Sequence, residues 1–185
     1  MAAAKVFAAA LAGLLISLPA QAGDGPSFSC TANLTQTEKT ICADPSLAAL
    51  DTVLAAAYAK KRDSLPEDSG NPLDDVRHAI VVTQKAWIAH RNQCGTDTAC
   101  IRKVYLVRTG ALTAGDNVPD VSCRDTIGAA QADLFVRECL QVATETHPPC
   151  NADNTCELIV SHSIFRCSTL GNQAPRFCAS FGKPN

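Results

Sequence analysis

The chain is poor in aromatic residues and in strand-forming patterns. Of its 185 residues, six are Phe, two are Tyr and one is Trp, and most of the 46% apolar fraction is Ala, Val and Leu. Small apolar side chains each bury little surface, so we expect a core that needs covalent cross-links. No segment alternates polar and apolar residues for long enough to predict a β-strand. These absences predict an all-α fold.

The motifs of common catalytic and metal sites are also missing. No Cys-x-x-Cys or His-x3-His pair is present, which argues against a thiol oxidoreductase and a zinc site. There is no Gly-x-Ser-x-Gly, and Asp74 and Asp75 are adjacent, so on a helix they point to different faces. We therefore predict no catalytic residue, no cofactor, no metal ligand and no enzymatic activity.

An excess of basic charge is absent as well. Without Lys5, which lies in the N-terminal leader, 15 basic and 18 acidic side chains remain. A chain of this balance gives no reason to expect a nucleic-acid partner.

Residues 1–22 have the pattern of a secretory signal peptide. Lys5 precedes an apolar run from Val6 to Leu18, and Ala20-Gln21-Ala22 supplies a small-residue cleavage site. The run is shorter than the about 20 residues of a transmembrane helix. We expect a soluble periplasmic or secreted protein, cleaved after Ala22 and without a transmembrane anchor; its oligomeric state is open.

Ten cysteines follow the leader. An even set in an oxidising compartment indicates a disulfide framework, in which each bridge can add roughly 2–4 kcal/mol. The set consists of Cys30, Cys42, Cys94, Cys100, Cys123, Cys139, Cys150, Cys156, Cys167 and Cys178.

For the first four cysteines the spacing allows two arrangements. Local bridges would be Cys30–Cys42 and Cys94–Cys100, and a nested pair would be Cys42–Cys94 with Cys30–Cys100. We favour the local set.

In the last six cysteines, intervals of 11 residues flank a central Cys150-x5-Cys156. Eleven residues are close to three helical turns, so the outer cysteines would return to the same face of a helical hairpin. This spacing predicts nested bridges Cys150–Cys156, Cys139–Cys167 and Cys123–Cys178.

Apolar periodicity and capping residues predict two domains, a disulfide-stapled helical hairpin at residues 23–116 and a second, six-cysteine helical hairpin at residues 117–185. Thr35 and Glu38 fit a capping box, and Asp44-Pro45 fits a helix start. Gly110, Gly115, Asn117 and Pro119 mark a linker. The expected helices cover about 35–42, 44–65, 74–94, 97–112, 126–143 and 155–170, with a short turn near Phe177.

Two sets of residues resemble the opening and closing motifs of the LprI-type lysozyme-inhibitor family. The first set is Phe28-Ser29-Cys30, Thr37-Glu38, Ile41-Cys42-Ala43, Leu47 to Asp51, Leu54 and Tyr58, and the second is Gln84, Trp87, Arg91, Cys94, Asp97, Cys100, Tyr105 and Arg108. The resemblance runs from Phe28 to about Leu112 and leaves the Cys123–Cys178 region unassigned. Ser29 stands where the family usually has Asp. Arg108-Thr109-Gly110 replaces an apolar continuation, which predicts early fraying of that helix.

The resemblance implies a small exported helical domain that binds and inhibits c-type lysozyme. Such lysozymes are basic, so the acidic residues Glu67, Asp68, Asp74 and Asp75 are the candidate partner-binding site. The alternative is a non-inhibitory envelope module that binds lipid, cell-wall material or another protein.

Trp87 lies on the inner stripe of its helix and is expected in the core. Asp51 and Arg91 should lie near one another if the two long helices pair about the Pro66–Pro72 turn. They would then be a contact pair for a partner or a partly buried structural ion pair, and we favour the ion pair.

Overall fold

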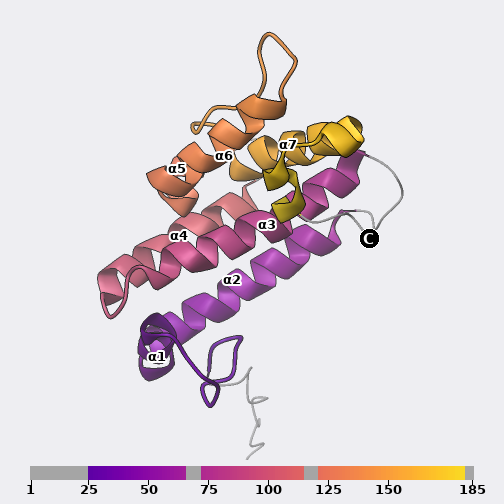
Figure 1. The fold of residues 1–185 in the computed structure, drawn as a ribbon. Helices are drawn as coiled ribbons and strands as arrows, with labels where there is room; N and C mark the ends of the chain where they lie inside the picture. The colour runs from indigo at the N-terminus through magenta and orange to yellow at the C-terminus, as the bar shows by residue number, and fades with distance from the viewer. Residues whose placement is uncertain (1–24, 66–71, 115–120, 182–185) are drawn as a thin grey trace, which may run out of the picture.

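The computed structural model describes residues 25–65, 72–114 and 121–181, and in these ranges the regular structure is helical throughout (Figure 1). This confirms the all-α prediction. The elements are α1 (Gln36–Ala43), α2 (Pro45–Asp63), α3 (Pro72–Asn92), α4 (Thr98–Thr113), α5 (Cys123–Ile127), α6 (Ala129–Val142), α7 (Cys156–Leu170), and the 3-10 turns η1 (Gly171–Gln173) and η2 (Arg176–Phe181).

Most helix starts follow the predicted capping residues. The Thr35 hydroxyl accepts from Glu38 N, and the Glu38 carboxylate accepts from Thr35 N, which completes the capping box. Asp44 caps α2 with Pro45 at its first position, and Thr155 caps α7. Local sequence therefore determines where these helices begin.

α3 is the central helix of the fold (Figure 1). α2 makes its most extensive contact with α4, and α7 packs along α3, with α6 beside α7. Trp87 of α3 is buried as predicted; its indole donates to the Val104 carbonyl of α4 at 3.2 Å. Its ring meets Tyr105 edge-on at 5.2 Å. Buried residues from α1 to η2 form one continuous core.

The prediction of a single helix over residues 126–143 was wrong, because Gly128 separates α5 from α6. Gly128 has a φ of +82°, a conformation that residues with a Cβ rarely adopt. A Cβ at this position would lie 3.0 Å from the His90 ring. The glycine therefore allows both the break and the close approach of α5 to α3.

The prediction that the fourth helix frays near Arg108 was also wrong. α4 continues to Thr113, and Arg108 is completely buried. Its Nη1 donates to Glu157 Oε1 of α7 at 2.9 Å, its Nε donates to Gln84 at 3.0 Å, and its Nη2 donates to Thr83 at 3.2 Å. Thr83 also donates to the same Glu157 oxygen at 2.7 Å. This Arg108 network joins α3, α4 and α7.

Two of the five disulfides join residues close in sequence in the first half. Cys30 is bridged to Cys42, and Cys94 to Cys100, which is the local arrangement that the spacing favoured. The nested alternative is absent from the structure.

The three predicted bridges of the second half were wrong. The structure joins Cys123 to Cys156, Cys139 to Cys150, and Cys167 to Cys178. Three features of the backbone explain the difference, and the first concerns Cys123. Its N–H donates to the Asn154 carbonyl at 2.7 Å, so the starts of α5 and α7 lie side by side.

The other two bridges follow from early chain reversals. α6 ends at Val142, and the chain turns back at once, so that Cys150 comes within 5.5 Å of Cys139 between Cα atoms. After Gly171, with a φ of +51°, the chain folds back so that η2 packs on α7. A hairpin that turned only at Asp153 would have placed these cysteines differently.

The predicted boundary at residue 116 lies outside the described residues, and the division into two domains remains a prediction. Within the described residues, no single helix is long and apolar enough to cross a membrane. α1 and α2, which meet at 108°, satisfy the length and composition criteria only when taken together.

We expect peptide mapping of the unreduced protein to recover Cys123–Cys156, Cys139–Cys150 and Cys167–Cys178. Thiol labelling of the denatured, unreduced chain should find no free cysteine, because the structure pairs all ten. Recovery of a Cys139–Cys167 peptide would contradict the structure and restore the nested hairpin.

Glu157→Ala should lower the free energy of unfolding by about 3–5 kcal/mol, because it leaves the Arg108 guanidinium buried and unpaired. The apolar double variant Arg108→Met/Glu157→Leu should lose much less, because it removes both charges. Chemical denaturation of the two variants and the parent measures the difference. A double variant as unstable as Glu157→Ala would show that packing, and not charge pairing, stabilises this contact.

Candidate functional site

The structure describes only part of the predicted acidic site. Glu67 and Asp68 lie outside the described residues, and Asp74 is described only as part of the α3 backbone. Asp75 is half-buried in the first turns of the same helix. Carboxylates near a helix N-terminus interact favourably with the helix dipole. Asp74 and Asp75 lie in the first turns of α3, so their charges also stabilise this helix.

The surroundings of this acidic segment are strongly basic. The last turn of α2 carries Lys60, Lys61 and Arg62, and Arg77 follows in α3. Arg62 Nε pairs with Asp63 at 2.7 Å. Residues 60–77 therefore hold five acidic and four basic side chains, so the segment is nearly neutral as a whole. The sequence argument counted only the acidic members.

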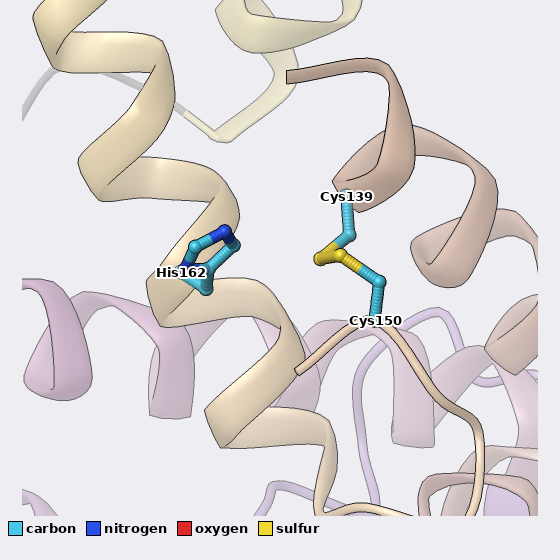
Figure 2. Close-up of side chains that lie close together, drawn as sticks. All are labelled: Cys139, Cys150 and His162. Atoms are coloured by element: carbon cyan, nitrogen blue, oxygen red, sulfur yellow. A yellow bond between two sulfur atoms is a disulfide. The ribbon is translucent and has the colours of Figure 1, made fainter. Parts of the chain in front are cut away.

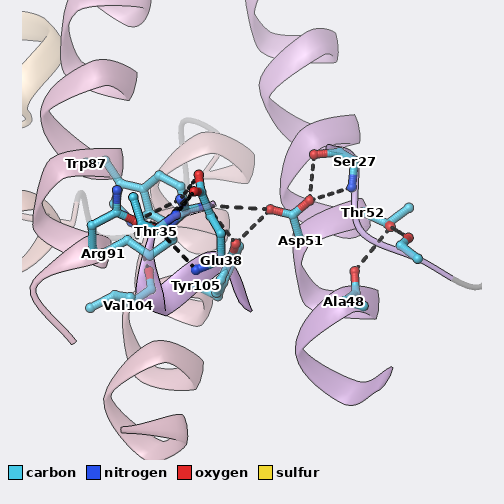
Figure 3. Close-up of polar contacts among 12 residues, drawn as sticks. Ser27, Thr35, Glu38, Ala48, Asp51, Thr52, Trp87, Arg91, Val104 and Tyr105 are labelled. Atoms are coloured by element: carbon cyan, nitrogen blue, oxygen red, sulfur yellow. Dashed lines mark hydrogen bonds and ion pairs between the residues drawn. The ribbon is translucent and has the colours of Figure 1, made fainter. Parts of the chain in front are cut away.

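The second candidate, Asp51 with Arg91, lies at the centre of a buried polar network (Figure 3). Arg91 Nη2 donates to Glu38 Oε1 at 3.1 Å, and Arg91 Nη1 donates to the Tyr105 hydroxyl at 3.2 Å. The Tyr105 hydroxyl donates to Asp51 Oδ1 at 2.7 Å, while Arg91 Nη1 is 3.9 Å from the same oxygen. The two residues are near one another, as predicted, and a tyrosine bridges them.

The other carboxylate oxygen of Asp51 holds the N-terminal segment. It accepts from Ser27 N at 2.6 Å and from Ser27 Oγ at 2.5 Å. The Arg91 guanidinium lies 5.9 Å from the Phe28 ring and 5.7 Å from the Trp87 ring. This Arg91 network thus connects α1, α2, α3, α4 and the chain before α1, which favours a structural ion pair over a contact for a partner.

Burial and hydrogen bonding shift two pKa values in the network. Burial raises the pKa of Tyr105, which therefore stays protonated and can donate to Asp51. For Glu38, partial burial opposes ionisation. The hydrogen bonds from Thr35 and the charge of Arg91 outweigh that effect, so the pKa of Glu38 is lowered.

An open groove of about 380 Å³ borders the Arg91 network between α2 and α3. Leu54, Tyr58 and Ile88 line it, and Lys85 is an exposed cation on its edge. Asp51 and Arg91 are almost fully buried beneath it, whereas the Glu38 side chain is 22% exposed. Ser27, Glu38, Asp51 and Arg91 of its lining are hydrogen-bonded within the Arg91 network, whereas the Lys85 side chain is exposed.

Cys139, Cys150 and His162 form the one trio of potential metal ligands among the described residues (Figure 2). The sequence offered no spacing signal for it, because His162 comes from α7 while the cysteines come from α6 and the loop after it. In the oxidised protein the two sulfur atoms are bonded to each other, so this trio supplies no thiolate.

Glu38→Gln should lower the stability of the folded protein at neutral pH, and the loss should shrink as the pH falls. The pKa of Glu38 is lower in the folded than in the unfolded chain, so its contribution is present above the unfolded value of about 4.3 and is lost as the pH falls through the folded pKa. Denaturation curves of parent and variant between pH 3 and pH 7 measure this difference.

Glu138→Gln is the matched control for this experiment. Burial raises the pKa of Glu138, so its charge disfavours folding and this variant should gain stability at neutral pH. A loss in Glu38→Gln that does not change with pH would contradict the charge-based account of the Arg91 network.

Comparison with known proteins gives one match. The model of a family described as "Lysozyme inhibitor LprI" matches residues 30–146, which extends past the end near Leu112 that the motifs had indicated and includes α5 and α6. No curated protein and no solved structure matches the chain significantly. Because the matched range covers more than half of the chain, this protein belongs to the LprI lysozyme-inhibitor family.

Proposed function

We propose that this protein is exported and that it binds and inhibits a c-type lysozyme. Membership of the LprI family is the observation that carries the proposal. In this proposal the protein acts by binding and not by catalysis, as the description of the family as lysozyme inhibitors suggests. The cleaved leader is residues 1–22, and the five disulfides support folding in an oxidising compartment, periplasmic or extracellular.

The turn between α2 and α3 is the proposed recognition segment. Its acidic residues Glu67, Asp68, Asp74 and Asp75 would attract a basic partner and increase the rate of encounter. Lys60 and Lys61, at the adjacent end of α2, would oppose this attraction. The electrostatic contribution is therefore a balance between two neighbouring sets of charges, and each set can be removed separately.

The fourfold variant Glu67→Gln/Asp68→Asn/Asp74→Asn/Asp75→Asn should associate with a c-type lysozyme more slowly than the parent. Its association rate should also depend less on salt, because the Debye length falls from about 10 Å at 0.1 M to about 3 Å at 1 M. Stopped-flow or surface-based kinetics at several salt concentrations, with the whole mature protein, measure both effects.

The control is Lys60→Gln/Lys61→Gln, which should associate faster than the parent. Arg62 is left unchanged because it pairs with Asp63. Thermal melting of both variants shows whether they remain folded. Absence of binding by the parent at tens of micromolar in low salt would reject the inhibitor proposal. Binding that both variants leave unchanged would retain the inhibitor and place its contact surface elsewhere.

A second candidate function, an envelope-binding module, is favoured by the apolar surface of the second half. Seven large apolar side chains of the described residues are exposed, and four of them lie on α6 and α7: Leu134, Leu140, Leu158 and Phe165. A contiguous apolar patch commonly marks a binding site for another protein or for lipid, and this candidate function requires these four side chains to form one. A lysozyme turnover assay distinguishes the two functions, because only the first predicts inhibition.

A further inference from the structure

A second open groove, of about 530 Å³, lies between the neighbouring helices α4 and α5 (Figure 1). Its apolar lining consists of Val104, Leu106 and Val107 of α4 and of Val121, which precedes α5. A hollow of about 440 Å³ on α4 shares Leu106 and Val107 with the groove, so the apolar surface continues across the helix. Leu106 is 57% exposed, the largest exposed fraction among the seven exposed large apolar side chains of the described residues.

Two exposed cations line the same groove, Lys103 from α4 and Arg124 from α5. The Lys103 ammonium group forms neither a hydrogen bond nor an ion pair with another described residue. Arg124 Nη2 is 3.7 Å from Asp133 Oδ1, and both side chains are 49% exposed, so this pair is weak. The whole chain has 18 acidic and 16 basic side chains, so the positive charge of the groove is a local property.

The polar groups of the described lining are richer in free donors than in free acceptors. Asp125 is its one carboxylate, and this group accepts from Ser122 Oγ at 2.8 Å. The Gly110 carbonyl accepts from Ala114 N at 2.8 Å, and His90 adds a ring nitrogen of either kind. A bound peptide would bring backbone donors as well as acceptors, and some of these donors would stay unpaired. A carboxylate only accepts and therefore suits this lining better.

We propose that this groove binds one long-chain fatty acid, with its carboxylate held by Lys103 and Arg124 and its acyl chain against the apolar lining. The volume is typical of small-molecule sites, which occupy about 300–1,000 Å³. Exposed ion pairs contribute little, so the acyl chain supplies most of the affinity. An uncharged chain would cover Lys103 without pairing its charge, which is unfavourable. This site is separate from the turn between α2 and α3 and does not depend on lysozyme binding.

Competition between oleate and a fluorescent fatty acid for the mature protein tests the ligand chemistry. One fluorescent molecule should bind per chain, and oleate should displace it less effectively as salt is added. Methyl oleate, which lacks the charge, should bind about threefold to tenfold more weakly than oleate. Hexanoate, which lacks most of the chain, should bind at least about a hundredfold more weakly. An acidic peptide that displaces the probe when oleate does not would overturn the proposal in favour of a peptide site.

Variants at exposed side chains locate the site, and thermal melting checks that they stay folded. Leu106→Ser should weaken oleate binding about tenfold. Lys103→Gln/Arg124→Gln should weaken it about threefold to tenfold and remove most of its salt dependence. The matched controls are Leu140→Ser, at a side chain that is 54% exposed on α6, and Lys85→Gln on α3; both should bind like the parent. No displacement by oleate, or equal losses in Leu106→Ser and Leu140→Ser, would overturn the proposal.

Discussion

The buried guanidinium of Arg108 is the contact on which the arrangement of the helices depends. A charge without access to water is tolerated only when it is paired and its donors are satisfied, and here Glu157, Thr83 and Gln84 together meet that requirement. Because these partners come from α3 and α7, satisfying one residue of α4 determines how α7 lies along α3. The second half of the chain is thereby joined to the first through a buried charged contact.

The disulfides complement a core of small side chains. Cys30–Cys42 and Cys94–Cys100 hold the ends of short segments, whereas Cys123–Cys156 spans 33 residues and joins the starts of two helices. In the loop-entropy account, the longer loop restricts the unfolded chain more and so contributes more stability. The Arg91 network has a related effect without covalent bonds, because Asp51 and Glu38 attach the N-terminal segment and α1 to the two long helices.

Family membership suggests what the protein binds, whereas the burial of each side chain indicates which residues are free to contact a partner. The LprI match reaches from Cys30 into the loop after α6, so it includes both buried networks apart from Glu157 and the N-terminal members Ser27 and Phe28. The largest side chains of the second motif that made the family recognisable, Trp87, Arg91, Tyr105 and Arg108, are buried. They define the fold and leave the contact surface to exposed residues, such as those of the turn between α2 and α3 and the apolar residues of α6 and α7.

The sequence by itself determined the helical class, the starts of α1, α2 and α7, the burial of Trp87 and the nearness of Asp51 to Arg91. The helical class, the helix starts and the burial of Trp87 depend on capping residues and apolar periodicity, which act over a few residues. The nearness of Asp51 to Arg91 was expected from pairing of the two long helices about the turn between them. Only the tertiary structure decided the second-half disulfides, the break at Gly128 and the continuation of α4 past Arg108. Each of these depends on a partner distant in sequence: Asn154 for Cys123, His90 for Gly128 and Glu157 for Arg108. Spacing along one segment carries no information about such partners, because their positions follow from how whole helices pack.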